Sequence, residues 1–186
     1  MICMSETIKI LGIDPGTTIT GYGLVEIRDK KPVIIDMGRI TPKSKSTHYE
    51  RIKVLHEESE KLMLKLKPDV MAIEAPFYGK DIQAMLKLGR GQGAIMVAAL
   101  THNVPIFEYA PLLVKQSITG MGRASKQQVA YFLQKVYHLN ELPETLDVSD
   151  AIAVAICHFI QMSRPAQKKE YKGWGDFIKK NPGRVK

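Results

Sequence analysis

The sequence has little of what marks secreted, membrane-spanning or zinc-binding proteins. It contains only two cysteines, Cys3 and Cys157, and its five histidines show no zinc-type spacing, so neither a disulfide framework nor a structural zinc site is expected. No uninterrupted apolar run reaches the roughly 18 residues that a membrane span needs. The N-terminus has no basic segment followed by an apolar core, the pattern of an export signal. We therefore expect a cytoplasmic protein of the reducing cytosol, with no membrane partner.

The length and composition are those of a single globular domain. The chain has 186 residues, of which 45% are hydrophobic and 25% charged, and this excludes a disordered or fibrous chain. The net charge is +8, and residues 164–186 carry +6 of it, with eight basic and two acidic residues. We expect one folded domain over residues 1–163 and a basic, poorly ordered tail over 164–186. That tail is either a solvated end or an electrostatic arm for a polyanion, and charge alone does not decide between them.

Short apolar runs alternate with amphipathic segments along the chain. Strands are expected at Thr7–Ile13, Tyr22–Arg28, Pro32–Ile40, Val70–Ile73 and Pro105–Tyr109. Helices are expected at Thr47–Leu66, Asp81–Asn103, Pro111–Ser117, Ser125–Tyr137 and Val148–Met162. The first three strands should be antiparallel, and the strands separated by helices should run parallel. This order predicts an α/β domain with a mixed five-stranded sheet and helices on both faces.

Four acidic residues lie at the borders of apolar elements. Asp14 and Glu74 end the first and fourth strands, and ligands of α/β sheets gather beyond the carboxyl ends of strands. Asp147 and Asp150 begin the last helix and share one of its faces. Each has a plainer explanation, since Asp-Pro-Gly is a turn sequence, Glu74 could simply leave the sheet, and acidic residues favour a first helical turn. Their combination is what favours a shared site.

If these four carboxylates converge, they need cations. Two like charges about 4 Å apart repel by roughly 4 kcal/mol at an effective dielectric constant of 20. Oxygen-only ligands suit Mg²⁺ or Mn²⁺. Two such ions can activate a water and stabilise the leaving oxygen of a phosphodiester. The sequence therefore predicts a metal-dependent reaction at a phosphate, provided that the four side chains meet.

Five motifs, in this order, resemble a known family over about residues 8–158. They are Ile10–Gly16 followed by Thr20–Gly23, then Ala72–Glu74, Leu86–Gly89, Phe107–Ala110 and Asp147–Ala151. Together they resemble the RuvC family of bacterial Holliday-junction resolvases. The resemblance implies an RNase H-like fold and a homodimer that makes two symmetric, metal-dependent nicks in a four-way DNA junction during recombination and repair. It also implies a branch-migration partner of the RuvA and RuvB type.

The same resemblance implies roles for individual residues. It assigns catalysis and the binding of two Mg²⁺ ions, for which Mn²⁺ can substitute, to Asp14, Glu74, Asp147 and Asp150. It places Phe77 at the junction centre, where an aromatic ring can stack on an unpaired base. Core packing is the alternative for Phe77. Further DNA contacts are expected at Lys115 and Lys126, near the scissile phosphates, and at Lys87, Arg90 and Arg123.

Two other functions compete with this interpretation. Gly12–Thr18 resembles the phosphate loop of sugar-kinase and actin-like phosphotransferases, but such proteins need two domains and a second loop, and we expect this chain to be too short. A non-catalytic DNA-binding module, in which the acidic residues only cap helices, would bind junctions without cleaving them.

Three glycines, Gly89, Gly91 and Gly93, interrupt the second predicted helix, where they suggest a bend or a close backbone approach. This helix is a candidate dimer interface.

Overall fold

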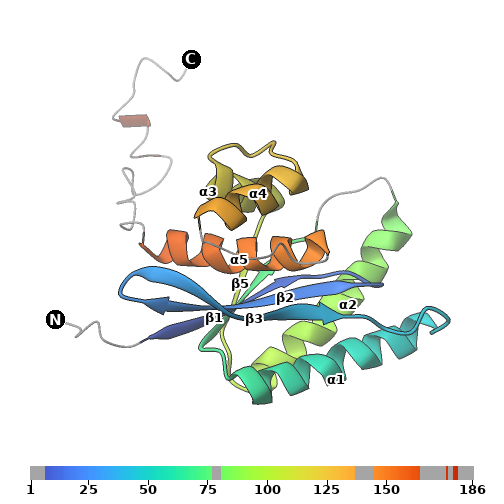
Figure 1. The fold of residues 1–186 in the computed structure, drawn as a ribbon. Helices are drawn as coiled ribbons and strands as arrows, with labels where there is room; N and C mark the ends of the chain where they lie inside the picture. Colours follow the sequence, from blue (N-terminus) through green and yellow to red (C-terminus); the bar gives the residue numbers. More distant parts are fainter. Residues whose placement is uncertain (1–6, 77–80, 137–144, 164–174, 176–177, 180–186) are drawn as a thin grey trace.

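The computed structural model describes residues 7–76, 81–136, 145–163, 175 and 178–179. Over these residues the chain forms five strands and five longer helices on two faces of one sheet (Figure 1). The strands are β1 (Ile8–Asp14), β2 (Thr20–Arg28), β3 (Lys31–Ile40), β4 (Val70–Glu74) and β5 (Ile106–Tyr109). The helices are α1 (His48–Leu66), α2 (Ile82–Thr101), α3 (Pro111–Thr119), α4 (Lys126–Val136) and α5 (Leu146–Ser163). The predicted elements are all present, with ends that differ by up to two residues.

The sheet has the order β3-β2-β1-β4-β5. Strand β2 pairs antiparallel with both β1 and β3, whereas β4 pairs parallel with β1 and β5 pairs parallel with β4. This confirms the predicted mixed α/β sheet. Because β1 and β4 are parallel neighbours, their carboxyl ends lie at the same edge of the sheet, and each ends on an acidic residue.

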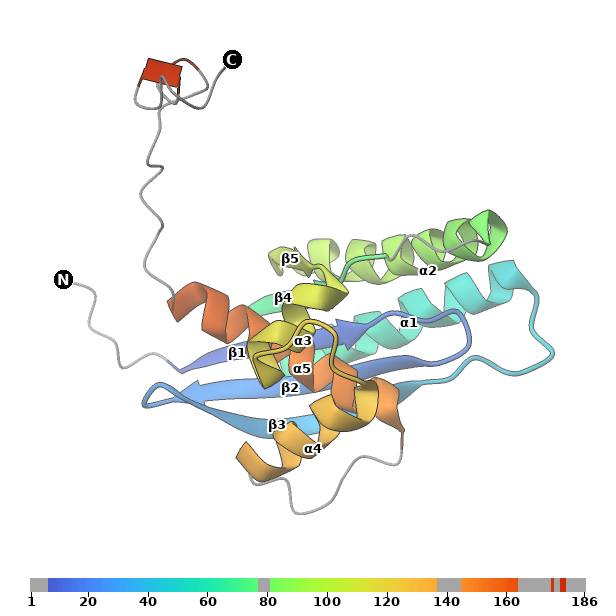
Figure 2. The ribbon, with the colours of Figure 1, turned by 90° about the horizontal axis from the view of Figure 1, so that it is seen from above.

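Helices cover both faces of the sheet, as predicted. Helices α3, α4 and α5 lie over one face, and α1 and α2 lie side by side under the other (Figures 1 and 2). Alternate residues of β1 point to opposite faces, so Ile10 enters the core beneath α5 while Leu11 and Ile13 enter the core beside α1 and α2. Each such side chain, fully buried, contributes about 1.5–3 kcal/mol. The two cores together hold β1 at the centre of the molecule.

Side-chain caps start several helices. Thr47 and Glu50 form a capping box at α1, in which the Thr47 hydroxyl accepts from the Glu50 backbone N–H and the Glu50 carboxylate accepts from the Thr47 N–H. At α4 the cap is Ser125, whose hydroxyl accepts from the Gln128 N–H at 3.1 Å. The Ser125 N–H donates in return to the Gln128 side chain at 2.8 Å. This reciprocal cap sets the position of the residue that follows it, Lys126.

Helix α5 lies directly on the backbone of β1 and β2. Its residues from Val148 to His158 are all buried. A Cβ at Gly12 would lie 2.0 Å from the carbonyl oxygen of Ala151, and a Cβ at Gly21 would lie 2.1 Å from that of Asp147. Only glycine allows so close an approach. By length and composition α5 could also cross a membrane, but 61% of it is buried in the protein, and its place against the sheet accounts for its apolar sequence.

Helix α2 runs from Ile82 to Thr101 through all three of its glycines. The expected close approach holds only at Gly91, where a Cβ would lie 3.0 Å from Leu55 of α1. A Cβ at Gly89 or Gly93 would meet nothing within 4 Å.

The division into a domain over 1–163 and a tail over 164–186 stays a prediction, since most of the tail lies outside the described residues.

Candidate active site

The four predicted carboxylates come from three elements that the fold brings to one edge of the sheet. Asp14 ends β1 and Glu74 ends the parallel neighbour β4. Asp147 and Asp150 lie in the first turns of α5, which the contact at Gly21 holds against β2 beside the end of β1. Side chains separated by more than 130 positions in the sequence therefore face one another.

Lys126 lies among these carboxylates. Its Nζ is 3.8 Å from the Oδ2 of Asp14 and 3.6 Å from the Oδ1 of Asp147, and it forms a third ion pair with the Oδ2 of Asp150. The lysine is the first residue of α4, so it reaches the site from an element different from those that carry the acids. One ammonium group thus contacts carboxylates from both β1 and α5.

Burial and mutual repulsion raise the pKa values of three of the carboxyl groups. The pKa of Asp14 is raised to about 7, first by burial and then by the charge of Glu74, with Lys126 opposing the shift. Burial and the charge of Asp150 likewise raise the pKa of Glu74 to about 7, against the charges of Lys126 and Lys115. Burial also raises the pKa of Asp150 despite its hydrogen bond to Lys126. The cluster thus holds more negative charge than one lysine neutralises.

Buried hydrogen bonds fix the backbone next to two of the acids. The Thr20 hydroxyl donates to the Gly16 carbonyl at 2.8 Å and accepts from the Gly16 N–H at 3.2 Å, which closes the turn after Asp14. The buried Gln92 of α2 donates to the Glu74 carbonyl at 3.3 Å. Our sequence analysis missed both residues. The signal available was a polar side chain at a position that the apolar pattern assigns to the core.

The donor set suits a divalent cation. An oxygen-ligated Mg²⁺ or Mn²⁺ site requires carboxylate oxygens, and this cluster supplies them. The ion pairs of Lys126 show that the cluster attracts a positive charge. Among the described residues, no three acidic, histidine or cysteine side chains already surround one point as metal ligands do. The Lys126 ammonium lies within 4 Å of the carboxylates of Asp14, Asp147 and Asp150.

The predicted DNA contacts lie at different distances from this cluster. Lys115 of α3 is half-buried, and its charge acts on both Glu74 and Asp150. Arg123 is exposed just before α4, whereas Lys87 and Arg90 are exposed on α2. Phe77 lies outside the described residues. Lys126 is in contact with the carboxylates themselves, which the sequence did not predict.

Comparison with known proteins agrees with this geometry. The sequence model of the family described as "Crossover junction endodeoxyribonuclease RuvC" matches residues 10–158. The protein of that description from Bacteroides fragilis is 51% identical over 179 residues, which cover 95% of each chain. The chain belongs to the RuvC family. A second RuvC relative, from Christiangramia forsetii, is 45% identical and covers 100% of this chain.

Solved structures of RuvC share the fold. Thermus thermophilus RuvC in complex with a Holliday junction substrate is 29% identical and superposes with a TM-score of 0.77 over 83% of this chain and 94% of that one. The yeast mitochondrial Holliday junction resolvase Ydc2 has a TM-score of 0.60 at 12% identity, over 82% of this chain and 79% of that one, which shows a common fold alone. The predicted RNase H-like fold and RuvC resemblance are confirmed, and the phosphotransferase alternative is set aside.

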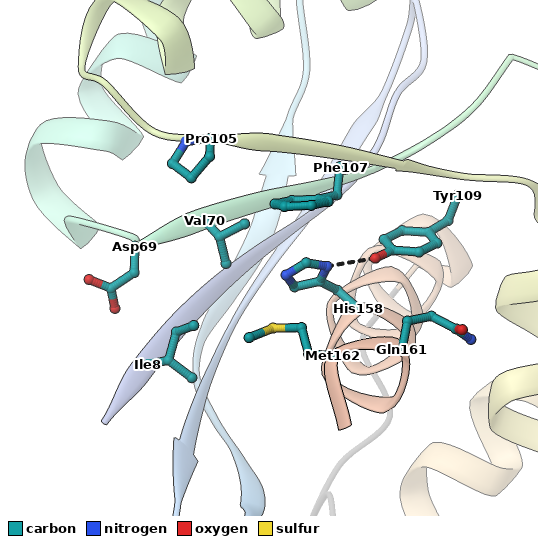
Figure 3. Close-up of a pocket in the computed structure, with 9 residues that line it drawn as sticks. All are labelled: Ile8, Asp69, Val70, Pro105, Phe107, Tyr109, His158, Gln161 and Met162. Atoms are coloured by element: carbon teal, nitrogen blue, oxygen red, sulfur yellow. Dashed lines mark hydrogen bonds between the residues drawn. The ribbon is translucent and has the colours of Figure 1, made fainter. Parts of the chain in front are cut away.

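The C-terminal end of α5 lies beside a cavity lined mainly by apolar and aromatic side chains, unlike its N-terminal end, which carries two carboxylates. A cavity of about 380 Å³ lies there, at the edge of the sheet where β1 and β4 begin, with Phe107, Tyr109 and Met162 among its lining side chains (Figure 3). The Tyr109 hydroxyl lies 2.6 Å from the Nδ1 of His158, and the Phe107 ring packs 4.6 Å from the imidazole. His158 is buried, and burial lowers its pKa. It is a packed core residue and is not part of the carboxylate cluster.

Proposed function

We propose that this protein is a cytoplasmic, metal-dependent endonuclease that resolves four-way DNA junctions by two symmetric nicks during recombination and repair. The observation that carries the proposal is a cluster of acidic side chains from β1, β4 and α5, in which Lys126 pairs with Asp14, Asp147 and Asp150 and the charge of Glu74 acts on Asp14. Membership of the RuvC family supports the reaction class. The similar Thermus thermophilus RuvC, solved in complex with a Holliday junction substrate, supports the choice of DNA.

The four carboxylates would hold the metal, Mg²⁺ or in its place Mn²⁺, and we propose two ions in each site. When bound, such ions activate a water for attack on the scissile phosphate and stabilise the 3′ oxygen that leaves. The protein itself supplies the positions of these ligands. Thr20 fixes the turn after Asp14, Gln92 fixes the backbone of Glu74, and the rigid start of α5 presents Asp147 and Asp150 together.

Two symmetric nicks require two such sites, and α2 offers the surface for a homodimer. Four of its apolar side chains are 51–66% exposed and repeat at helical spacing along one stripe. They are Ile82, Leu86, Val97 and Leu100. Gly89 and Gly93 fall on the same stripe and leave open space beside the helix. A two-fold axis next to α2 would pack one stripe on its copy and set two active sites on one junction.

The DNA would approach the edge where the carboxylates lie. Lys115 and Arg123 carry positive charge beside the cluster, and we propose that they contact phosphates near the cleaved bond. Phe77, Lys87 and Arg90 stay predicted DNA contacts. The branch-migration partner of the RuvA and RuvB type also stays a prediction.

The experiment is incubation of the full chain with a synthetic four-way junction, in Mg²⁺ and in EDTA, with the products scored for paired symmetric nicks. Asp14→Asn should lower the cleavage rate by about a thousandfold or more, because a metal ligand stabilises the transition state by several kcal/mol. Its affinity for the junction should stay within a few-fold of the wild type, since the amide keeps the shape of the carboxylate.

Asp29→Asn is the matched control, because it makes the same change of charge in the exposed turn between β2 and β3. This control should cleave like the wild type. Cleavage in EDTA, or robust cleavage by Asp14→Asn, would contradict the proposal. Junction binding without nicks in Mg²⁺ would favour the non-catalytic DNA-binding module instead.

A further inference from the structure

Lys126 combines three contacts that an ordinary surface lysine does not make. Its ammonium lies within 4 Å of carboxylate oxygens on Asp14, Asp147 and Asp150. Within the described ranges, every ion pair that these three acids make goes to Lys126. A divalent cation held by these acids would need the same oxygens. The lysine and the metal therefore compete for one position.

The lysine can leave this position easily. Its side chain is 47% exposed, whereas the side chains of Asp14 and Asp150 are 16% and 11% exposed. The ammonium thus enters the cluster from the solvent side, on a flexible stem that starts at the first turn of α4. Movement of this stem alone would free the carboxylates, and no helix or strand would have to shift.

We propose that Lys126 is a displaceable counter-ion, which holds Asp14, Asp147 and Asp150 together in the metal-free protein and is expelled toward solvent when divalent metal binds. The inference rests on the proposed function, since it takes these acids as the metal site. The expelled ammonium is then available to a phosphate at the mouth of the site. Metal binding and the positive charge offered to DNA are in this way coupled through one side chain.

The competition has two measurable consequences. Removal of the ammonium should tighten metal binding, because the metal no longer has to displace a cation or bind close to one. The same removal should destabilise the metal-free protein, because the carboxylates then repel one another without a counter-ion. An ordinary phosphate-binding lysine predicts neither effect in the absence of DNA.

The test is a titration of the full-length protein with Mn²⁺ at pH 8 without DNA, in which free Mn²⁺ is followed by its paramagnetic resonance signal. We expect Lys126→Met to bind Mn²⁺ at least about tenfold more tightly than the wild type. Lys126→Arg, which keeps the charge, should stay close to the wild type. The melting temperature of Lys126→Met in EDTA should fall by about 3 °C or more.

Lys115→Met is the matched control. It removes one positive charge that also acts on Glu74 and Asp150, from a lysine that forms no ion pair with the described acids, so it should tighten Mn²⁺ binding less than Lys126→Met does. Equal or weaker Mn²⁺ binding by Lys126→Met than by the wild type would overturn the inference and leave the proposed function standing. An absence of Mn²⁺ binding in every variant would instead remove the metal site and with it the proposed function.

Discussion

Helices α5 and α2 are of similar length, 18 and 20 residues, and lie on opposite faces of the sheet, yet each meets glycines in a different way. Under α5, the glycines of β1 and β2 have no room for a Cβ, because the helix backbone already lies there. On α2, Gly89 and Gly93 have nothing within 4 Å, and apolar side chains beside them are exposed. The α5 interface is completed by the chain itself. The α2 surface is an exposed apolar stripe, which the proposed homodimer would cover.

The largest effect should come from a methyl group placed under α5. In Gly12→Ala, the new Cβ would lie 2.0 Å from the Ala151 carbonyl oxygen, so α5 must move away from the sheet and carry Asp147 and Asp150 with it. We expect a loss of about 3 kcal/mol in the free energy of unfolding, measured with urea, and a loss of junction cleavage. Wild-type stability in this variant would show that α5 can move away from β1 without a loss of folding free energy.

A charge on the α2 stripe should have the next largest effect. We expect Leu100→Glu to weaken dimerisation by about 100-fold, or about 2.8 kcal/mol, in sedimentation measurements, because it buries a carboxylate in an apolar contact. Leu64→Glu on α1 is the matched control, since Leu64 is 61% exposed and Leu100 is 60% exposed. If both variants dimerise like the wild type, the dimer uses another surface.

The carboxylate cluster beside α5 should also make stability depend on pH, because the pKa values of Asp14, Glu74 and Asp150 are raised. In the folded protein the pKa values of Asp14 and Glu74 are about 7, so between pH 5 and 7 the folded state binds protons that the unfolded state has released. Stability in EDTA should therefore fall as pH rises through this range, by about 2 kcal/mol for each of the two groups and about 4 kcal/mol for both. Chemical denaturation at each pH measures this slope.

The slope should flatten in Asp14→Asn, which removes one of the two titrating groups, and Mg²⁺ should restore stability at pH 7 by binding the ionised carboxylates. The dimer contact expected on α2 is apolar and should change little over the same range. A stability that rises from pH 5 to 7 in EDTA would contradict the raised pKa values.

The smallest effect should be a gain. In the Leu100→Glu background, where α2 is expected to be free, Gly89→Ala should stabilise the protein by about 1 kcal/mol, because alanine is the better helix former and its Cβ meets nothing. In the wild-type background the same change should weaken the dimer if the partner helix lies close. Destabilisation in both backgrounds would mean that Gly89 has a contact within its own chain.

Much of this fold could be predicted from the sequence because the spacing of apolar residues and the residues that end helices and strands are local signals. The runs around Ile10 and Met71 are typical of buried strands, and Pro68 ends a helical pattern, so the mixed sheet followed. The candidate site was predictable only as a set of acids at the ends of apolar elements. That Asp14 lies close to Asp150 depends on the approach of α5 to Gly12, and that it lies beside Glu74 depends on the register of β1 against β4. No short window of sequence contains either contact.

The roles of the basic residues were harder to predict, because the partner of a charged side chain can lie far away in the sequence. Lys126 was expected near a phosphate, which stays a prediction, and in this structure it pairs with three carboxylates. Lys87 and Arg90 were chosen for charge and for a motif, and they lie exposed on α2. Whether they contact DNA stays a prediction, as it does for Phe77.

Helix α5 has one consequence for anyone who would redesign this protein. Its first two turns supply two of the four acids, and the remainder fills most of the core above the sheet. Substitutions chosen to repack that core would therefore also shift the acids and lower the proposed nuclease activity. To place the acids on another scaffold, one would have to transfer the helix together with the two glycine-containing strands beneath it. On α2, the exposed apolar stripe is separate from the buried Gln92 that holds the Glu74 backbone, so the proposed dimer contact could be altered there provided that Gln92 is kept.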